Sequence, residues 1–316
     1  MISLNKNIKK KLHQYLKQRL GMYDYRRGWL KGNCPYCGAH KFGVNLGQSR
    51  SNCFKCENHP SLFQLVMDLE YLSTIPEVLT YLNTFEGVDF YEELVEPHEL
   101  KKDITLPEGY RNIKRGNNTL ARAARNYVKN RGFDIDFVSL KGWGYCDRGK
   151  YFGYLIMPFY MKGKVCYFNA RLFLGNGPKF NNPLVEDFGL GKSMLIYNID
   201  ALFLYKTIYA FESVTNATTI GDNAIGLGGK KISTWQKNII IKSPCEKVII
   251  GLDDDAIDDA IKLAFELVDY KKVKILEFPY KKDANDMGRK KTLKLSHTSR
   301  YLKYGDIITL KNNMYN

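Results

Sequence analysis

Two pairs of cysteines with the same short spacing constrain the fold of this 316-residue chain more than any other feature. Cys34 and Cys37 form the first Cys-x-x-Cys pair, Cys53 and Cys56 form the second, and 15 residues separate the pairs. The spacing is typical of a four-cysteine zinc ribbon, in which two tight turns supply four thiolates to one tetrahedral ion. Because four sulfurs close the shell, we expect a structural zinc ion; four incidental thiols are the disfavoured alternative.

The other three cysteines, Cys146, Cys166 and Cys245, lie far apart, and the total of seven is odd. This usage argues against a secreted disulfide framework and for a reducing compartment. The first 20 residues are lysine-rich and amphipathic and lack the apolar stretch of a secretory signal. No apolar run approaches the roughly 18 residues of a membrane span. We therefore expect a cytoplasmic protein without a membrane partner.

Charge is distributed in blocks along the chain, which carries 48 Lys and Arg against 33 Asp and Glu, a net charge of +15. Residues 1–70 carry 12 basic and 4 acidic side chains, residues 71–110 carry 2 and 9, and residues 111–206 carry 16 and 6. Two basic blocks around an acidic connector favour a polyanionic partner that is contacted by separate modules. A chain made basic for solubility is the alternative that charge alone leaves open.

The pattern of apolar residues divides the chain into five parts. They are a zinc-binding domain at 1–85, an acidic linker at 86–108, a basic α+β region at 109–206, an α/β region at 207–291 and a basic tail at 292–316. Helices are predicted at 5–20, 61–69 with Ser61 as the cap, 75–84, 119–130 and 256–268, and a hairpin of strands at 151–159 and 165–173. Strands at 207–211, 247–252 and 272–278 alternate with helical segments, which is typical of a parallel sheet.

Acidic side chains follow the strands of this predicted sheet. Glu212 follows the first strand, Asp253 and Asp255 follow the second, and the third leads into Asp283 and Asp286. The carboxyl ends of parallel strands meet at one edge, so these carboxylates converge and repel one another unless a cation binds. Oxygen ligands on a phosphate-handling protein favour two or more Mg²⁺ or Mn²⁺ ions. Acids at a helix N-terminus are the alternative, which accounts for the middle cluster only.

Basic and aromatic side chains surround the cysteine pairs. Lys41, Arg50 and Phe54 are suited to phosphate contact and base stacking, although a solvated basic face is the alternative. His40 and His59 could in principle replace a cysteine as ligands. Because four cysteines already fill the shell, we expect both histidines at the surface.

Taken together, these motifs resemble the bacterial-type (DnaG-like) DNA primases and their phage relatives over most of the chain. Residues 34–63 resemble the primase zinc-binding domain in its four-cysteine form, residues 163–198 resemble the basic half of the polymerase core, and residues 211–286 resemble a TOPRIM domain. The resemblance implies an α/β multi-domain protein with an N-terminal zinc ribbon, a mixed α+β basic subdomain and a TOPRIM Rossmann-like parallel sheet. Two positions depart from the family pattern, because Asn216 and Asn285 stand where acids are common.

The resemblance also implies roles for individual residues. The catalytic and magnesium-binding residues would be Glu212, Asp253, Asp255 and Asp283, with Asp286 as a further magnesium ligand. The residues near the template or the incoming triphosphate would be Arg171, Lys179, Asn182 and Lys192, with Lys41 and Arg50 on the zinc-binding domain. The zinc ligands would be Cys34, Cys37, Cys53 and Cys56.

The function implied by the resemblance is the synthesis of short RNA primers on single-stranded DNA. The substrates would be nucleoside triphosphates, the product an RNA–DNA hybrid, and the source a phage or mobile element in a host cytoplasm. The glycines at 226–229 before Lys230 lack the spacing of an ATP-binding loop, so we expect any replicative helicase to be a separate partner. The alternatives are a TOPRIM-type metal-dependent nuclease and a catalytically silent zinc-ribbon DNA-binding protein. A topoisomerase is a weaker alternative than the nuclease.

Overall fold

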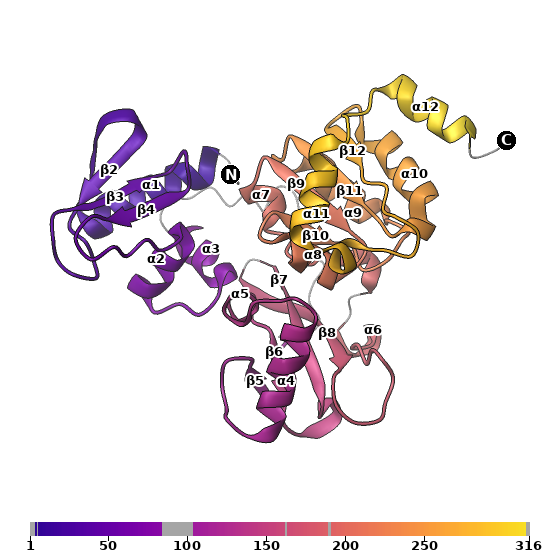
Figure 1. The fold of residues 1–316 in the computed structure, drawn as a ribbon, viewed down its shortest axis with the longest axis horizontal. Coiled ribbons are helices and arrows are strands. Elements are labelled where there is room, and N and C mark those ends of the chain that lie inside the picture. The colour runs from indigo at the N-terminus through magenta and orange to yellow at the C-terminus, as the bar shows by residue number, and fades with distance from the viewer. Residues whose placement is uncertain (1–3, 5, 84–103, 162, 189–190, 314–316) are drawn as a thin grey trace.

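The computed structural model describes residues 4, 6–83, 104–161, 163–188 and 191–313, and Figure 1 shows that they form three lobes. Each lobe is built on one four-stranded sheet. The acidic linker predicted at 86–108 lies outside the described residues up to residue 103. None of the described helices has both the length and the apolar character that a membrane span needs.

The N-terminal lobe, indigo and purple in Figure 1, has an antiparallel sheet whose strands follow in sequence order. Its strands are β1 (Tyr23–Asp24), β2 (Trp29–Gly32), β3 (Phe42–Asn45) and β4 (Arg50–Cys53), and its helices are α1 (Lys6–Leu20), the 3-10 turn η1 (Arg26–Gly28), α2 (Leu62–Glu70) and α3 (Ile75–Asn83). The predicted cap of α2 is confirmed, because Ser61 Oγ accepts a hydrogen bond from the Gln64 amide at 3.1 Å. This helix packs Leu65 and Val66 into the core beneath the cysteine turns.

The middle lobe, magenta in Figure 1, is a second antiparallel sheet in sequence order. Its strands are β5 (Tyr110–Asn112), β6 (Gly144–Cys146), β7 (Tyr154–Met161) and β8 (Lys164–Leu172), and its helices and turns are α4 (Thr119–Asn130), α5 (Ile135–Leu140), η2 (Gly149–Tyr151), α6 (Val185–Phe188) and η3 (Lys192–Met194). The predicted β7–β8 hairpin is confirmed. The first strand begins three residues later than predicted because residues 149–151 form a 3-10 turn.

The C-terminal lobe has a parallel sheet with the strand order β10-β9-β11-β12, which confirms the predicted parallel arrangement. Its strands are β9 (Thr207–Phe211), β10 (Ala224–Gly226), β11 (Lys247–Gly251) and β12 (Lys272–Ile275). Its helices are α7 (Ala201–Leu204), α8 (Val214–Ile220), α9 (Thr234–Lys242), α10 (Ile257–Leu267) after the turn η4 (Asp254–Ala256), α11 (Ala284–Thr298) and α12 (Tyr304–Asn313).

The parallel sheet is buried on both faces, and the alternation of side chains along β9 shows how. Ile208 and Ala210 join one hydrophobic cluster, which includes side chains of α9 and α10. Tyr209 and Phe211 point to the opposite face and join a second cluster, which includes α8 and the middle lobe. Successive strand residues point to opposite faces, so a continuous apolar run serves both clusters. The sheet is thereby fixed against the middle lobe.

The segment predicted as a weakly patterned tail from residue 292 forms ordered structure. Helix α11 continues across this boundary, and Thr292 and Ser296 are buried on its inner face. The Leu302 amide then donates to the Val273 carbonyl at 2.9 Å, which extends the edge of the sheet. Small polar residues on the buried face give no apolar period, which is why the sequence pattern missed the helix.

Candidate active site and zinc site

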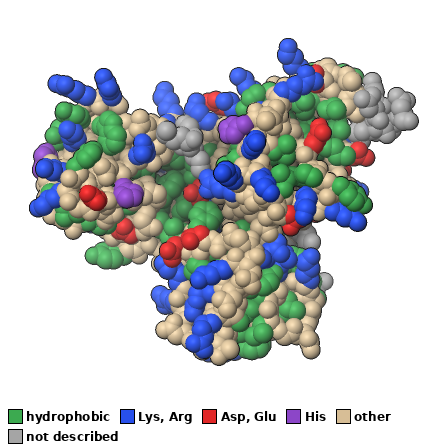
Figure 2. Space-filling model, viewed as in Figure 1, with side chains coloured by type: hydrophobic (Ala, Val, Ile, Leu, Met, Phe, Trp, Pro, Cys, Tyr) green, Lys and Arg blue, Asp and Glu red, His purple; other side chains and the backbone are tan. Residues whose placement is uncertain are grey.

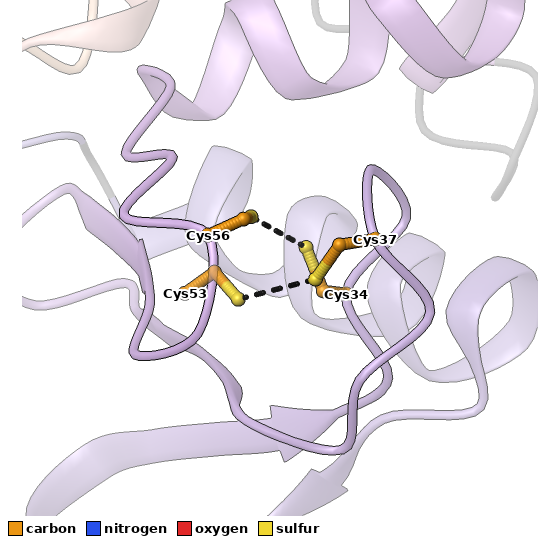
Figure 3. A group of neighbouring side chains, drawn as sticks. All are labelled: Cys34, Cys37, Cys53 and Cys56. Carbon is orange, nitrogen blue, oxygen red and sulfur yellow. Dashed lines mark hydrogen bonds between the residues drawn. The ribbon is translucent and has the colours of Figure 1, made fainter.

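The four cysteines of the two pairs lie together, as Figure 3 shows, and this confirms the predicted cluster. Cys34 and Cys37 are on the turn before β3, Cys53 is the last residue of β4, and Cys56 is on the turn that follows β4. The Cys34 and Cys56 sulfurs are 3.8 Å apart, those of Cys37 and Cys53 are 3.7 Å apart, and all four lie within 4.8 Å of one another. Cys34 and Cys53 are buried.

This geometry fits a zinc ion. Four Zn–S bonds of about 2.3 Å in a tetrahedron place the sulfurs about 3.8 Å apart, close to the separations observed. At Cys53, backbone N–H groups favour the thiolate: the Cys56 amide is the main cause that lowers the pKa of Cys53, and the Lys55 amide, 3.4 Å from its sulfur, also contributes. Burial instead raises the pKa of Cys34. Because the cysteines alone provide four ligands, the ion would be structural.

The predicted surface position of the histidines agrees with the structure. His40 Nδ1 lies 2.9 Å from Asn33 Oδ1, and His59 Nδ1 lies 2.7 Å from the Glu57 carbonyl oxygen. Both residues are outside the cysteine cluster.

A cavity of about 740 Å³ opens beside β2 and β3 in the N-terminal lobe. Its lining consists of aromatic and basic side chains with one glycine: Tyr25, Arg26, Arg27, Trp29, Lys31, His40, Lys41, Phe42, Gly43 and Phe54. Phe54 is 70% exposed, so its ring is free to stack with a planar ligand. Lys41 therefore lies in this cavity, whereas Arg50 is exposed at the start of β4 and is not among the lining residues.

Sequence reasoning missed several of these residues. Tyr25, the adjacent pair Arg26 and Arg27, and Trp29 lie before the first cysteine pair, and no spacing rule links them to it. The one available signal was the occurrence of two arginines between aromatic residues, which is typical of nucleic-acid contacts.

The acidic residues of the C-terminal lobe lie where strands of the parallel sheet end. Glu212 follows β9, Asp253 follows β11 and immediately precedes the turn η4, and Asp283 caps α11 by accepting a hydrogen bond from the Asp286 amide at 2.8 Å. Residue 251 has to be a glycine for the end of β11 to lie this close to the Phe211 ring of β9, because a Cβ at residue 251 would lie 2.6 Å from Phe211 Cε1. The backbone thus brings Glu212 and Asp253 to one edge.

The electrostatics of this edge favour a cation. Burial, and then the charge of Asp253, raise the pKa of Glu212. Burial, and then the charge of Asp283, raise the pKa of Asp253. In addition, Glu212 Oε2 is buried and has no hydrogen-bond partner among the described residues. Hard oxygen ligands with excess negative charge fit Mg²⁺ or Mn²⁺, so the residues fit the implied metal.

The carboxylates are nevertheless more widely spaced than the thiolates. Among the described residues, no group of three acidic or histidine ligands lies within the 4.8 Å that encloses the four cysteines. Asp255 is exposed and forms an ion pair with Lys230, and Asp286 is exposed on the first turn of α11. The loop that carries Lys230 is fixed at its start, because the Gly228 amide donates to the Glu212 carbonyl at 2.8 Å. Lys230, two residues later, reaches Asp255 from this loop.

A cavity of about 240 Å³ connects Glu212 with the middle lobe. Asn169 and Arg171 of β8, Asn182 and the start of α8 contribute to its lining. Arg171 is held in place, since its Nε donates to Tyr127 Oη at 2.6 Å and its guanidinium lies 5.2 Å from the centre of the Phe180 ring. A fixed cation therefore shares one cavity with the half-buried carboxylate of Glu212.

The other predicted contact residues differ in their surroundings. Asn182 Oδ1 accepts a hydrogen bond from the Ala170 amide at 3.0 Å, which ties its loop to β8. Lys179 is exposed, with its ammonium 5.9 Å from the centre of the Phe180 ring. Lys192 begins η3, and its side chain lies outside the described residues. Figure 2 shows further Lys and Arg side chains on all three lobes.

Comparison with known proteins gives a likeness in structure only. Neither a family model nor a curated protein matches the sequence. The DnaG primase catalytic domain bound to single-stranded DNA is similar with a TM-score of 0.53 and 14% identity, over 63% of this chain and 77% of that chain. The E. coli primase catalytic core is similar with a TM-score of 0.50 and 14% identity, over 61% of this chain and 77% of that chain.

A third structure, the zinc-binding and RNA polymerase domains of the Aquifex aeolicus primase, aligns with 92% of this chain and 84% of that chain at 18% identity and a TM-score of 0.49. The two catalytic domains above carry the conclusion about the fold, since their TM-scores are 0.50 or higher. Over about three fifths of its length, this chain has the fold of the DnaG-type primase catalytic domain.

Proposed function

We propose that this chain is a DNA primase that synthesises short RNA primers on single-stranded DNA from nucleoside triphosphates. The observation that carries the proposal is the strand-end carboxylate Glu212, whose Oε2 is buried and has no hydrogen-bond partner among the described residues, and which shares a cavity with the fixed guanidinium of Arg171. The fold, which is that of primase catalytic cores, supports the same reading.

The parallel sheet in this proposal is a TOPRIM domain whose carboxylates hold Mg²⁺ or Mn²⁺. The ligands would be Glu212, Asp253, Asp255 and Asp283, with Asp286 at the periphery. When bound, two such ions lower the pKa of an attacking ribose hydroxyl and stabilise the charge on the α-phosphate. The ligands would come from the ends of β9 and β11 and from the N-terminus of α11, and Glu212 Oε2 is buried.

Basic residues of the middle lobe hold the triphosphate and the template. Arg171 is fixed by Tyr127 and Phe180, so little side-chain freedom is lost when it contacts a phosphate. Lys179 and Asn182, on the segment that follows β8, would extend the same surface, and Lys192 is assigned to template or triphosphate contact by the resemblance alone. Fixed positive charge near the reacting phosphate stabilises the negative charge that develops there.

The N-terminal lobe contributes a template-binding surface. The cavity beside β2 and β3 combines Trp29 and Phe54, which can stack on bases, with Arg26, Arg27 and Lys41, which can contact phosphates. The zinc ion holds the turns that carry Lys41 and Phe54. In a cell, a separate replicative helicase would supply the single strand in the cytoplasm.

Primer synthesis tests the proposal directly. The full chain, a mixed-sequence single-stranded DNA, labelled ribonucleotides and Mg²⁺ are incubated, and the products are separated on a denaturing gel. We expect short RNA products from the wild type and a loss of at least a hundredfold for Asp253→Ala. The matched control is Asp258→Ala, which removes an exposed acid of α10 and leaves synthesis unchanged.

Two other outcomes of this experiment would support the alternative functions. Metal-dependent loss of the template without RNA products would mean a nuclease with the same metal site. Binding of DNA that is indifferent to Asp253→Ala would mean a silent binding protein.

A further inference from the structure

A buried amide joins two of the segments that carry the acidic residues. Asn216, on α8, is fully buried. Its Nδ2 donates to Asp253 Oδ1 at 3.1 Å, and its Oδ1 accepts from the backbone amide of Asn285 at 3.1 Å. Asp283 lies two residues before Asn285 and caps the same helix, α11. One side chain therefore ties the end of β11 to the turn that carries Asp283.

The side chain of Asn285 anchors that turn in its place. Its Oδ1 accepts from Arg131 Nη2 at 2.6 Å, and its Nδ2 donates to the Arg131 carbonyl at 3.1 Å and to Thr219 Oγ1 at 2.9 Å. Arg131 follows α4 in the middle lobe, whereas Thr219 is on α8. The hydrogen bonds thus form a continuous chain from the middle lobe through Asn285 and Asn216 to Asp253.

Hydrogen bonds of this kind orient the side chains that bind a metal ion. An amide offers one acceptor oxygen and two donor hydrogens, and Asn216 uses both kinds of group on protein partners. A neutral donor facing a carboxylate orients it and adds no charge to a site that is already too negative. An acid at position 216 would instead add a further like charge next to Asp253.

We propose that Asn216 and Asn285 are positioning residues that orient Asp253 and place the Asp283 turn for a divalent cation, and that Arg131 fixes this arrangement to the middle lobe. Neither amide is itself a ligand. The inference rests on the proposed function only in taking Asp253 and Asp283 as cation ligands, and it does not require that the chain make primers.

Binding of Mn²⁺ to the full, zinc-loaded chain tests the proposal without an activity measurement. The free ion is counted by electron paramagnetic resonance during titration, and Asp253→Asn first identifies the signal of the site. Loss of an outer partner of a metal ligand costs about 10- to 100-fold in affinity, so we expect a loss in this range for Asn216→Ala. Asn285→Ala removes three side-chain bonds and keeps its backbone donor, so we expect the lower end, about tenfold.

The matched control is Asn223→Ala. Asn223 is also buried in the parallel-sheet lobe, and its Nδ2 donates to the Thr207 carbonyl at 3.0 Å, with no printed contact to an acidic residue. Its removal tests the effect of losing a buried amide alone. We expect a lower melting temperature and an Mn²⁺ affinity that stays within about twofold of the wild type.

A milder variant keeps the test informative if Asn216→Ala does not fold. Thr219→Val is nearly isosteric and removes only the hydroxyl contacts, which include the bond from Asn285. We expect a weakening of Mn²⁺ binding by a few fold with an unchanged circular dichroism spectrum.

Two results would overturn the proposal. The first is that folded Asn216→Ala and Asn285→Ala bind Mn²⁺ no more weakly than Asn223→Ala, which would make both amides purely structural. The second is that Asp253→Asn leaves Mn²⁺ binding unchanged, which removes the cation site itself. A wild type that binds Mn²⁺ through Asp253 but makes no primers would contradict the primase proposal alone, and the positioning role would stand.

Discussion

The zinc site and the acidic site differ in how their ligands are brought together. The four thiolates come from residues 34–56, on two turns next to neighbouring strands, and their sulfurs already have the spacing that a tetrahedral ion needs. The carboxylates come from residues 212–286, at the ends of strands and helices that meet only after the parallel sheet has formed. A short motif therefore specifies the first site, and tertiary structure specifies the second.

The two sites also differ in what surrounds the ligands. Backbone amides point at the cysteine sulfurs, which is the support that a permanently bound ion requires. Around the acids, Asp253 accepts from the side-chain amide of Asn216, Asp255 pairs with the ammonium of Lys230, and Asp283 accepts from a backbone amide, while one oxygen of Glu212 has no partner among the described residues. On the proposed function, zinc would complete a fold, whereas the acidic site would bind ions that enter and leave with substrate.

Removal of a zinc ligand should have the largest effect, and it tests whether the N-terminal lobe needs zinc to fold. We expect Cys53→Ser to abolish zinc binding and unfold the N-terminal lobe, since a structural zinc contributes about 10–16 kcal/mol in small zinc domains. Zinc content by mass spectrometry and limited proteolysis of residues 1–83 measure the effect. Cys245→Ser, at a buried thiol outside the cluster, serves as control and retains zinc.

The outcome that contradicts the comparison is an N-terminal lobe that stays protected from protease without zinc. The thiolates would then be incidental to the fold of that lobe, and the core around Leu65 and Val66 would be sufficient for it.

The parts of the fold that rest on local signals were predictable from the sequence. The cap at Ser61, the helix over residues 119–130 and the strand over residues 207–211 are found where their patterns placed them. In each case the signal is within a few residues: a capping side chain, an amphipathic stripe or a short β-branched and aromatic run. The four-cysteine cluster belongs to the same class.

The parts that depend on contacts between segments far apart in the sequence were not predictable. Helix α11 buries Thr292 and Ser296, which give no apolar pattern, and Lys230 reaches Asp255 only through a loop that is fixed by the Glu212 carbonyl. Asn216 and Asn285 were recognised as departures from an acidic pattern, yet their hydrogen bonds follow from packing of α8 against α11. The roles of the acidic and basic site residues stay predictions.

A carboxylate outside both sites sharpens the comparison. Asp200 is buried, its Oδ1 has no hydrogen-bond partner among the described residues, and burial raises its pKa to about 7. The value in the unfolded chain is about 3.9, so the folded chain binds an extra proton between these limits. The contribution of Asp200 to the free energy of unfolding is fully present below about pH 4. It is lost as the pH rises to about 7, and the loss is at most about 4 kcal/mol.

Urea unfolding at about pH 5 and about pH 8 measures this effect. We expect Asp200→Asn to reduce the decline in unfolding free energy between the two pH values, whereas the exposed Asp258→Asn leaves it as in the wild type. An equal decline in Asp200→Asn and the wild type would show that Asp200 is ionised in the folded chain, with a partner that compensates its charge.

The smallest expected effect concerns Lys230, whose ammonium group lies at the acidic site. Lys230 pairs with Asp255, and a divalent ion that binds Asp255 has to displace this ammonium. Exposed ion pairs contribute about 0.2–1 kcal/mol, so Lys230→Ala should tighten Mn²⁺ binding by at most about fivefold, and high salt should remove the difference. Lys231→Ala, at the exposed neighbouring position, is the matched control. Weaker Mn²⁺ binding in Lys230→Ala would mean that Lys230 positions Asp255 and does not compete for it. The acidic site would then be preorganised by its own side chains in the same sense as the zinc site is by its backbone.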